Sequence, residues 1–145
     1  MVARILIGAD HAGFELKEKL KSFLMEQSWS VIDVGTHEEA SCDYPDIAHD
    51  LCNRLLNGDA QMGILICGTG LGMSIAANRH AGIRAALCTS EFHARMGRAH
   101  NDANVLVFGG RVTGFEAAMY ILRVWLETEF EGGRHSRRVQ RIETL

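Results

Sequence analysis

Short runs of β-branched and aliphatic residues recur along the chain and alternate with segments whose apolar residues follow helical spacing. The runs predict strands at Ala3–Gly8, Ser30–Val34, Gly63–Cys67, Ile83–Leu87 and Val105–Gly109. Apolar residues three or four positions apart predict helices over Phe14–Phe23 and Ile47–Leu56. Parallel strands need a crossover connection, which a helix supplies. The alternation therefore predicts an α/β fold, a three-layer α/β/α sandwich around a five-stranded parallel, Rossmann-like sheet.

The last part of the chain predicts a long helix followed by a break. Thr113-Gly-Phe-Glu116 fits a capping box ahead of the apolar run Ala117–Leu126, so a helix is expected to start there and to carry Trp125 into an interface. Gly132-Gly133 then interrupts the pattern. The residues beyond these glycines are too few to build a core of their own.

The break divides a single domain into an α/β part, residues 1–131, and a helical arm, residues 132–145. Such an arm must dock, either on its own domain or on a second subunit. We favour a second subunit because small α/β proteins commonly form symmetric dimers. The arm is therefore expected to pack at a dimer interface.

Composition supports one compact domain and excludes several classes of function. The 145 residues are 47% hydrophobic. On folding, a chain of this length buries about two-thirds of the surface that it exposes when unfolded, so it needs neither disulfides nor a structural metal. The formal net charge of −3 gives no basic excess for binding nucleic acid. The sequence has neither a membrane-spanning run nor a signal-peptide pattern, so a cytoplasmic protein is expected. Its four cysteines form no CxxC pair and are expected to be reduced and metal-free.

The most informative segment is a strand that runs into a glycine-rich turn and then a helix, Ile64-Leu-Ile-Cys67-Gly-Thr-Gly-Leu-Gly-Met-Ser74. Ligands of open α/β sheets bind at the carboxyl ends of strands, where this turn lies. Its glycines let the backbone approach a ligand, and the N–H groups form an anion cradle with the helix N-terminus. Cys67 opens the cradle, and the helix dipole favours its thiolate. The thiol is therefore a candidate base or nucleophile near neutral pH.

Three common motifs do not fit this turn. A dinucleotide fingerprint would need glycine at position 73, and a P-loop would need lysine followed by serine or threonine after the last glycine, where the chain has Met73-Ser74. A cysteine phosphatase loop would need arginine in place of Met73. A tight structural turn around a buried, inert cysteine stays open as the alternative.

Two further pairs of polar residues are candidates for a catalytic or substrate-binding role. Asp10 and His11 follow the first predicted strand, where a carboxylate beside an imidazole suits proton transfer or binding of hydroxyl groups. A role of Asp10 as helix N-cap is equally consistent with the sequence. His100 and Asn101 precede the fifth predicted strand, where His100 could act as acid or base and Asn101 as a donor. The alternative is a polar connection between helix and strand.

Arginine dominates the basic residues. Only Lys17, Lys19 and Lys21 among the 15 basic residues are lysine, which leaves twelve arginines. Arg134, Arg138 and Arg141 share one face if the arm is helical, and guanidinium groups bind phosphate oxygens bidentately. Arg111 follows the fifth strand, at the same end of the sheet as Cys67. A charged exterior helix is the alternative for the arm.

A set of motifs spreads over nearly the whole chain in a specific order and spacing. It comprises Gly8-Ala-Asp10-His11-Ala-Gly13, Asp43-Tyr44-Pro45, Cys67-Gly-Thr-Gly-Leu-Gly-Met-Ser74, Ala76-Ala-Asn78, Gly82-Ile-Arg84, His100-Asn101-Asp102-Ala-Asn104 and Glu131-Gly-Gly-Arg134-His135. Together these motifs resemble the type B ribose-5-phosphate isomerases. The wider family also contains galactose-6-phosphate isomerase subunits and isomerases of allose 6-phosphate.

The resemblance implies interconversion of D-ribose 5-phosphate and D-ribulose 5-phosphate, in the non-oxidative pentose phosphate pathway, through a cis-enediolate and without metal or cofactor. By similarity Cys67 is the base that moves the proton from C2 to C1, because the position of the alternative glutamate is Met73 here. His100 would open the sugar ring. The residues implied in substrate binding are Asp10, His11, Tyr44, Gly68, Thr69, Gly70, Leu71, Gly72, Asn101, Arg111, Arg134 and Arg138.

The family assembles its site between two subunits, so the resemblance implies a homodimer, with a tetramer left open. Three alternatives remain at this point: an isomerase of a six-carbon sugar phosphate, one subunit of a hetero-oligomeric galactose-6-phosphate isomerase, and a sugar-phosphate sensor without turnover. The presence of Cys67, His100 and the arginines in one chain favours a self-sufficient homodimer over the hetero-oligomer.

Overall fold

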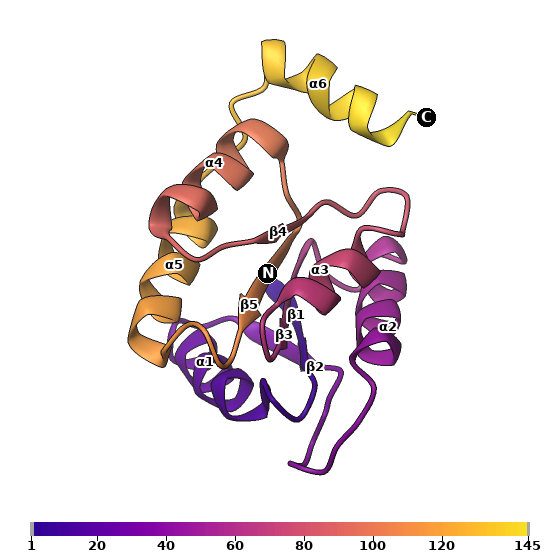
Figure 1. The fold of residues 1–145 in the computed structure, drawn as a ribbon. Coiled ribbons are helices and arrows are strands. Elements are labelled where there is room, and N and C mark those ends of the chain that lie inside the picture. Colours follow the sequence, from indigo (N-terminus) through magenta and orange to yellow (C-terminus); the bar gives the residue numbers. More distant parts are fainter. Residues whose placement is uncertain (1, 145) are drawn as a thin grey trace.

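The computed structural model describes residues 2–144, which form a three-layer α/β/α sandwich (Figure 1). The central sheet is parallel, with five strands in the order β2-β1-β3-β5-β4. Its strands are β1 (Arg4–Ala9), β2 (Ser30–Asp33), β3 (Met62–Cys67), β4 (Ala85–Leu87) and β5 (Val105–Gly109). The predicted fold class is confirmed, and β4 is shorter than its prediction because Ile83 belongs to a turn, where its N–H donates to the His80 carbonyl at 3.1 Å.

Helices connect successive strands and cover both faces of the sheet. They are α1 (Phe14–Glu26), α2 (Tyr44–Leu56), α3 (Leu71–Ala77), α4 (Glu91–Asn101), α5 (Phe115–Glu127) and α6 (Arg134–Glu143). Both predicted amphipathic helices are present. α2 begins three residues before its first predicted apolar position, Ile47, because Pro45 occupies the first turn and its fixed φ suits a helix start.

Two separate cores hold the layers together. On one face α1, α4 and α5 pack against β-strand residues such as Ile7, Ile66 and Phe108 (Figure 1). On the other face α2 and α3 pack against the alternate residues, including Leu65 and Val107. Strands buried on both faces read as continuous apolar runs, which is why the sequence predicts them so clearly. Cys67 belongs to the α2–α3 face.

The predicted capping box before α5 does not form. The N-cap of α5 is Gly114, with no side-chain hydrogen bond, and Thr113 is buried with its own N–H donating to the Gly109 carbonyl at 2.9 Å. The chain leaves β5 in a tight turn that includes Thr113, and the helix starts only after this turn. The helix is where the sequence places it, but its cap was predicted wrongly.

The expectation that Trp125 reaches an interface is also wrong. Its side chain is fully buried in this chain's own core, with the Arg98 guanidinium 5.6 Å from the ring. The indole lies between α5 and α4, which pack side by side. Trp125 therefore stabilises the domain and is not available to a second subunit.

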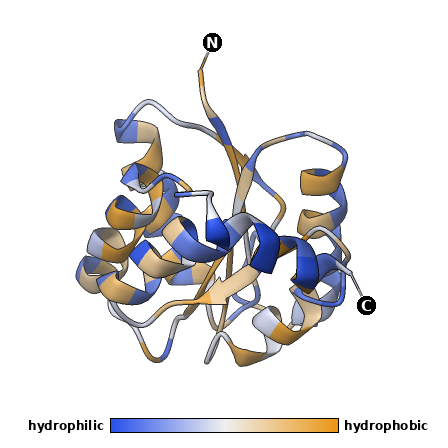
Figure 2. Ribbon diagram, turned by 90° about the horizontal axis from the view of Figure 1, so that it is seen from above, coloured by the Kyte–Doolittle hydropathy of each residue, from blue (hydrophilic) through white to orange (hydrophobic). Residues whose placement is uncertain are grey.

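The arm forms α6, which lies outside the three layers, next to α4 and at the edge where the strands begin (Figure 1). Seen from above, α6 is mostly hydrophilic (Figure 2). Only His135 of this helix is buried. Within residues 2–144, no helix has the length and apolar character needed to cross a bilayer.

Candidate active site

The turns that follow β1, β3 and β5 are joined backbone to backbone at the carboxyl edge of the sheet. The N–H of Asp10 donates to the Ile66 carbonyl at 3.1 Å, and the N–H of Gly110 donates to the Cys67 carbonyl at 2.7 Å. A Cβ on Gly110 would lie 2.5 Å from the carbonyl oxygen of Ala12, so only glycine permits this approach. The residues after the three central strands therefore line one continuous surface.

Cys67 ends β3 at this edge and is 4% exposed. The backbone N–H of Gly70 donates to its sulfur at 3.2 Å. Gly70 has φ +82°, and a Cβ there would lie 2.5 Å from Leu87 Cδ1 and 3.0 Å from the carbonyl carbon of Phe108. Glycine is thus required to bring this amide onto the sulfur. A donor in that position stabilises negative charge on the thiol.

The sequence predicts an interaction of Cys67 with the N-terminus of the following helix. Gly70 is the N-cap of α3, so the amide that contacts the sulfur belongs to that helix N-terminus. The turn itself is braced by Thr69, whose Oγ1 accepts the N–H of Leu71 at 3.2 Å. The interaction between Cys67 and the helix N-terminus thus includes one directed hydrogen bond.

Asp10 holds the turn after β1. Its side chain is almost completely buried, and Oδ1 accepts the N–H of Ala12 at 3.0 Å and of Gly13 at 3.2 Å. The N-cap of α1 is Gly13 rather than Asp10. Asp10 thus organises the turn at the edge of the candidate site without capping the helix.

The segment between β2 and α2 folds back over the same surface. The N–H of Cys42 donates to Nδ1 of His11 at 3.3 Å, which fixes the orientation of that imidazole. Tyr44, the first residue of α2, lays its ring against Gly72, and a Cβ on Gly72 would overlap this ring. His11 and Tyr44 are therefore both placed beside the glycine-rich turn.

Arg111 closes the surface on the β5 side. Its N–H donates to the Gly68 carbonyl at 3.0 Å, and its guanidinium Nη1 lies 3.5 Å from where a Cβ of Gly68 would be. The guanidinium is the positive charge next to the glycine-rich turn. Six predicted elements of the site therefore lie together at the carboxyl edge: Asp10, His11, Tyr44, Cys67, residues 68–72 and Arg111.

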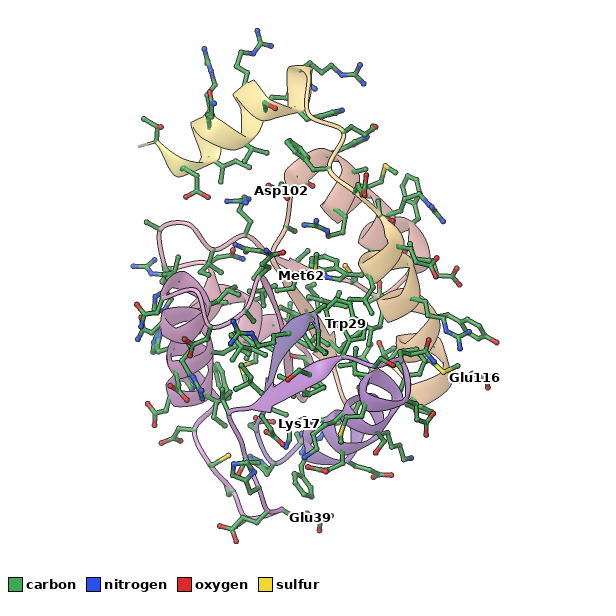
Figure 3. The ribbon with its side chains drawn as sticks, turned by 180° about the vertical axis from the view of Figure 1, so that it is seen from behind. Lys17, Trp29, Glu39, Met62, Asp102 and Glu116 are labelled. Atoms are coloured by element: carbon green, nitrogen blue, oxygen red, sulfur yellow. The ribbon has the colours of Figure 1, made fainter. Side chains whose placement is uncertain are left out.

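The other predicted residues lie at the opposite edge of the sheet. His100 and Asn101 end α4, shortly before β5 begins at Val105, whereas β5 ends at Gly109 beside Cys67. Arg134 and Arg138 are exposed on α6, next to α4. Figure 3 labels Asp102 below α6 and Glu39 at the far end of the molecule. The length of the sheet therefore separates these residues from Cys67 within one chain.

At that amino edge two imidazoles stack. The rings of His100 and His135 are 4.1 Å apart between centroids with an interplanar angle of 10°, and Nε2 of His100 lies 3.6 Å from Oε1 of Glu131. Burial, together with the positive charges of His100 and Arg134, lowers the pKa of His135. The neutral ring of His135 thus packs against one face of the His100 ring, while the Glu131 carboxylate lies beside Nε2 of His100.

Ligand atoms of His100, Glu131 and His135 all lie within 4.8 Å of one another, the separation expected of a metal site. The two rings are parallel, however, and the lone pair of an imidazole nitrogen lies in the plane of its ring. Lone pairs in parallel planes do not converge on one ion. The arrangement is that of a stacked pair with an ionic neighbour, not of a preformed metal centre.

Four residues hold this amino edge together without a role having been predicted for them from the sequence: Arg84, Glu131, His135 and Glu143. Arg84, Glu131 and His135 occur in the motifs of the resemblance, and His135 also lies beside the arginines of the arm. One signal was present: Arg84 interrupts an apolar, strand-like run, and an arginine in such a place is buried only when it is paired.

Comparison with known proteins agrees with the motifs. The Ribose/Galactose Isomerase family profile matches residues 5–142. The chain belongs to this family. The ribose-5-phosphate isomerase B of Escherichia coli is 46% identical over 142 residues, covering 98% of this chain and 95% of that protein. The D-erythrulose-4-phosphate isomerase of Pectobacterium atrosepticum, another member, is 41% identical over 139 residues and covers 95% and 91%.

Solved structures of ribose 5-phosphate isomerases share the whole fold. A ribose 5-phosphate isomerase from Thermotoga maritima is 52% identical, with a TM-score of 0.97 over 99% of each chain. The type B enzyme of Trypanosoma brucei is 41% identical, with a TM-score of 0.94 over 99% of this chain and 98% of that one. The predicted resemblance to the type B isomerases is thereby confirmed.

Proposed function

We propose that this protein interconverts D-ribose 5-phosphate and D-ribulose 5-phosphate through a cis-enediolate, with Cys67 as the base. The relatives named ribose-5-phosphate isomerase support the isomerase class and the five-carbon substrate. The observation that carries the choice of base is the hydrogen bond from Gly70 to the Cys67 sulfur, at the carboxyl edge where sheet proteins of this kind bind ligands. An inert structural cysteine has no need of a glycine held at positive φ to reach its sulfur.

The proposed reaction is a pair of proton transfers. Sγ of Cys67 takes the C2 proton of the open-chain aldose, the C1–C2 double bond forms, and the electron pair moves to O1. The thiol then returns its proton to C1, while the proton on O2 moves to O1 and C2 becomes the ketone. N–H groups of residues 68–72 stabilise the enediolate oxygens, and the loss of one such donor typically costs about 2.7–4 kcal/mol.

Ribose 5-phosphate is mainly a ring, so the ring must open before C2 is reached. We assign this step to His100, with Asp10 at the substrate hydroxyls and Asn101 at the enediolate. The phosphate is assigned to His11, Arg111, Arg134 and Arg138, since arginine forks match phosphate oxygens. Tyr44 would pack against the sugar from its place on Gly72.

This assignment requires two copies of the chain. Cys67, His11 and Arg111 lie at one edge of the sheet and His100, Arg134 and Arg138 at the other, so a single chain does not bring base and ring-opening acid together. In a symmetric dimer the amino edge of each subunit can cover the carboxyl edge of its partner. We therefore propose a homodimer with two shared sites, and we expect the monomer to be inactive.

The test is proton NMR of the purified protein with ribose 5-phosphate in deuterated water. We expect ribulose 5-phosphate with deuterium at C1, and we expect a Cys67→Ala variant of unchanged stability to form none. A Cys88→Ala variant is the matched control, because that buried thiol lies on the other side of the sheet.

The same experiment separates the alternatives. Turnover of allose or galactose 6-phosphate in preference to the pentose would move the substrate to a six-carbon sugar while leaving the mechanism in place. Binding of ribose 5-phosphate with neither isomerisation nor exchange would favour a sensor. A correctly folded, pure homodimer without activity would favour a hetero-oligomeric enzyme.

A further inference from the structure

Arg84 lies between the β4 strand and the loop before it, at the amino edge of the sheet, and its side chain is 17% exposed. Its backbone is fixed by Asn104, whose Oδ1 accepts the Arg84 N–H at 2.8 Å and whose Nδ2 donates to the Gly82 carbonyl at 2.9 Å. A guanidinium so far removed from water needs several partners. It finds them on two elements that carry predicted site residues.

The first group of partners is the end of α4. Nε of Arg84 donates to the carbonyls of Asn101 and Asp102, each at 3.1 Å, and Nη2 donates to the Asp102 carbonyl at 2.9 Å. The last carbonyls of a helix have no partner within the helix, so the guanidinium supplies one. Asp102 has φ +46°, which ends the helix sharply. Arg84 therefore fixes the turn that carries His100 and Asn101.

The second partner is the end of α6. Nη1 of Arg84 contacts Oε1 of Glu143 at 2.7 Å, and the N–H of Gly82 donates to Oε2 at 2.8 Å. The hydrogen bond from Arg84 and the one from Gly82, opposed by partial burial, lower the pKa of Glu143, so this carboxylate is ionised at neutral pH. Arg84 and Glu143 both line a cleft of about 600 Å³ between α6 and the 78–86 segment.

The other end of α6 is attached to α4. The N–H of Glu131 donates to the Ala99 carbonyl at 3.0 Å, and His135 stacks on His100. The helix is thus held at its first turn by α4 and at its last turn by Arg84. Arg134 and Arg138 project from the span between these attachments.

We propose that Arg84 is a positioning residue that sets the geometry between the ring-opening pair, His100 and Asn101, and the phosphate arginines, Arg134 and Arg138. This inference rests on the proposed function. All four residues have to enter the partner's site together, and an error of about 1 Å in such a set can cost about a hundredfold in rate. One guanidinium that bonds to both α4 and α6 fixes the position of His100 and Asn101 relative to Arg134 and Arg138.

Lysine cannot take this place. The contacts to Asn101, Asp102 and Glu143 use three different nitrogens of one planar group, whereas a lysine has a single nitrogen on a flexible stem. Arg84→Lys keeps the positive charge but cannot contact the end of α4 and Glu143 of α6 at the same time. We therefore expect Arg84→Lys to behave like Arg84→Met rather than like the wild type.

Kinetics of three variants test the proposal. We expect Arg84→Met to lower kcat about tenfold or more and to raise KM, because both sets of residues lose their placement. Glu143→Gln frees only α6, so KM should rise several-fold while kcat stays within about twofold. Arg54→Met is the matched control, because its 3.1 Å pair with Asp59 lies at the C-terminal end of α2 and joins neither α4 nor α6, so neither constant should change.

A second readout does not depend on activity. The ring protons of His100 and His135, assigned with a His100→Asn spectrum, should shift in Arg84→Met and, less, in Glu143→Gln, but not in Arg54→Met. Unshifted rings with wild-type kinetics in a folded Arg84→Met would overturn the proposal. Equal losses in Arg84→Met and Arg54→Met would also overturn it, since they would show general destabilisation. A wild type that isomerises no sugar phosphate would instead refute the proposed function, and the spectra would still decide the role of Arg84.

Discussion

The backbone N–H of Gly70 points at the sulfur of Cys67 from 3.2 Å, and a side chain at Gly70 would collide with Leu87. Gly70→Ala has to adopt φ +82° or move the turn, and an alanine at such an angle costs about 1–3 kcal/mol. We expect lower stability in urea unfolding and, because the donor leaves the sulfur, a loss of turnover larger than in Gly58→Ala. Gly58 also has positive φ but lies in open space, so it is the control for backbone strain alone. Equal activity of the two variants would contradict the role given to this amide.

The cysteines should differ sharply in reactivity. Burial raises the pKa of Cys52 and that of Cys88 to about 12 each, so both are protonated at neutral pH. Because the thiolate is the reactive form, iodoacetamide should leave these two unmodified until the protein unfolds. Loss of activity should follow modification of Cys67, as measured by peptide mass spectrometry.

Cys42, which is partly exposed, provides the control for this experiment. We expect it to be labelled as well, and a Cys42→Ser variant should be inactivated at the same rate as the wild type. Ribose 5-phosphate should slow the modification of Cys67 alone. Inactivation that tracks Cys42 or Cys88 would be incompatible with Cys67 as the base.

A buried lysine gives the fold a defined response to acid. Lys17 is fully buried and its Nζ lies 2.6 Å from Oδ2 of Asp33, which Lys21 also contacts at 2.9 Å (Figure 3 labels Lys17). Burial opposes the charge on Asp33, but the hydrogen bonds from Lys17, Lys21 and the Gly35 N–H outweigh it, so the pKa of Asp33 is lowered. A carboxyl group with a lowered pKa stabilises the fold above its unfolded value, and this stabilisation is lost as pH falls through the folded value.

Asp33→Asn should therefore destabilise the protein at pH 7, by less than the about 3–5 kcal/mol of an unpaired buried charge, because Lys17 keeps its contact with Glu18 at 3.0 Å. The difference from the wild type should begin to shrink as pH falls below the ordinary aspartate pKa of 3.8, and it should vanish only below the lowered pKa of folded Asp33. Urea unfolding at pH 7 and at acidic pH measures this. Asp59→Asn, which removes the exposed partner of Arg54, should cost less than about 1 kcal/mol at either pH. A difference for Asp33→Asn that does not change with pH would speak against the ion pair.

The sequence predicts the layers because their pattern is strong and local. The central strands are continuous apolar runs, and α1 and α2 repeat apolar residues at helical spacing, so each can be recognised without its neighbours. The N-cap of α5 was predicted wrongly because the spacing of Thr113 and Glu116 carries no information on how tightly the chain turns after β5. The position of Trp125 was predicted wrongly because the same apolar sequence pattern suits a helix face that packs on its own domain and one that packs on another subunit.

The candidate site was predictable in part. Cys67 ends one strand of a parallel sheet and Arg111 follows another, so their common edge can be inferred from the sequence alone. The contact between Arg84 and Glu143 could not, because 59 residues separate them and many other charged pairs were equally consistent with the sequence. The stack of His135 on His100 likewise depends on how α6 returns to α4, which no local pattern encodes.

Each site proposed here combines Cys67 of one chain with His100 of another, and complementation between two inactive subunits distinguishes this arrangement from a site within one chain. Cys67→Ala and His100→Asn homodimers should both be inactive. When the two variants are co-expressed, about half of the dimers are mixed, and each mixed dimer has one intact site by symmetry. Recovery of about a quarter of wild-type activity is therefore expected. Mixed dimers, isolated with two different tags, that remain as inactive as either parent would contradict this arrangement.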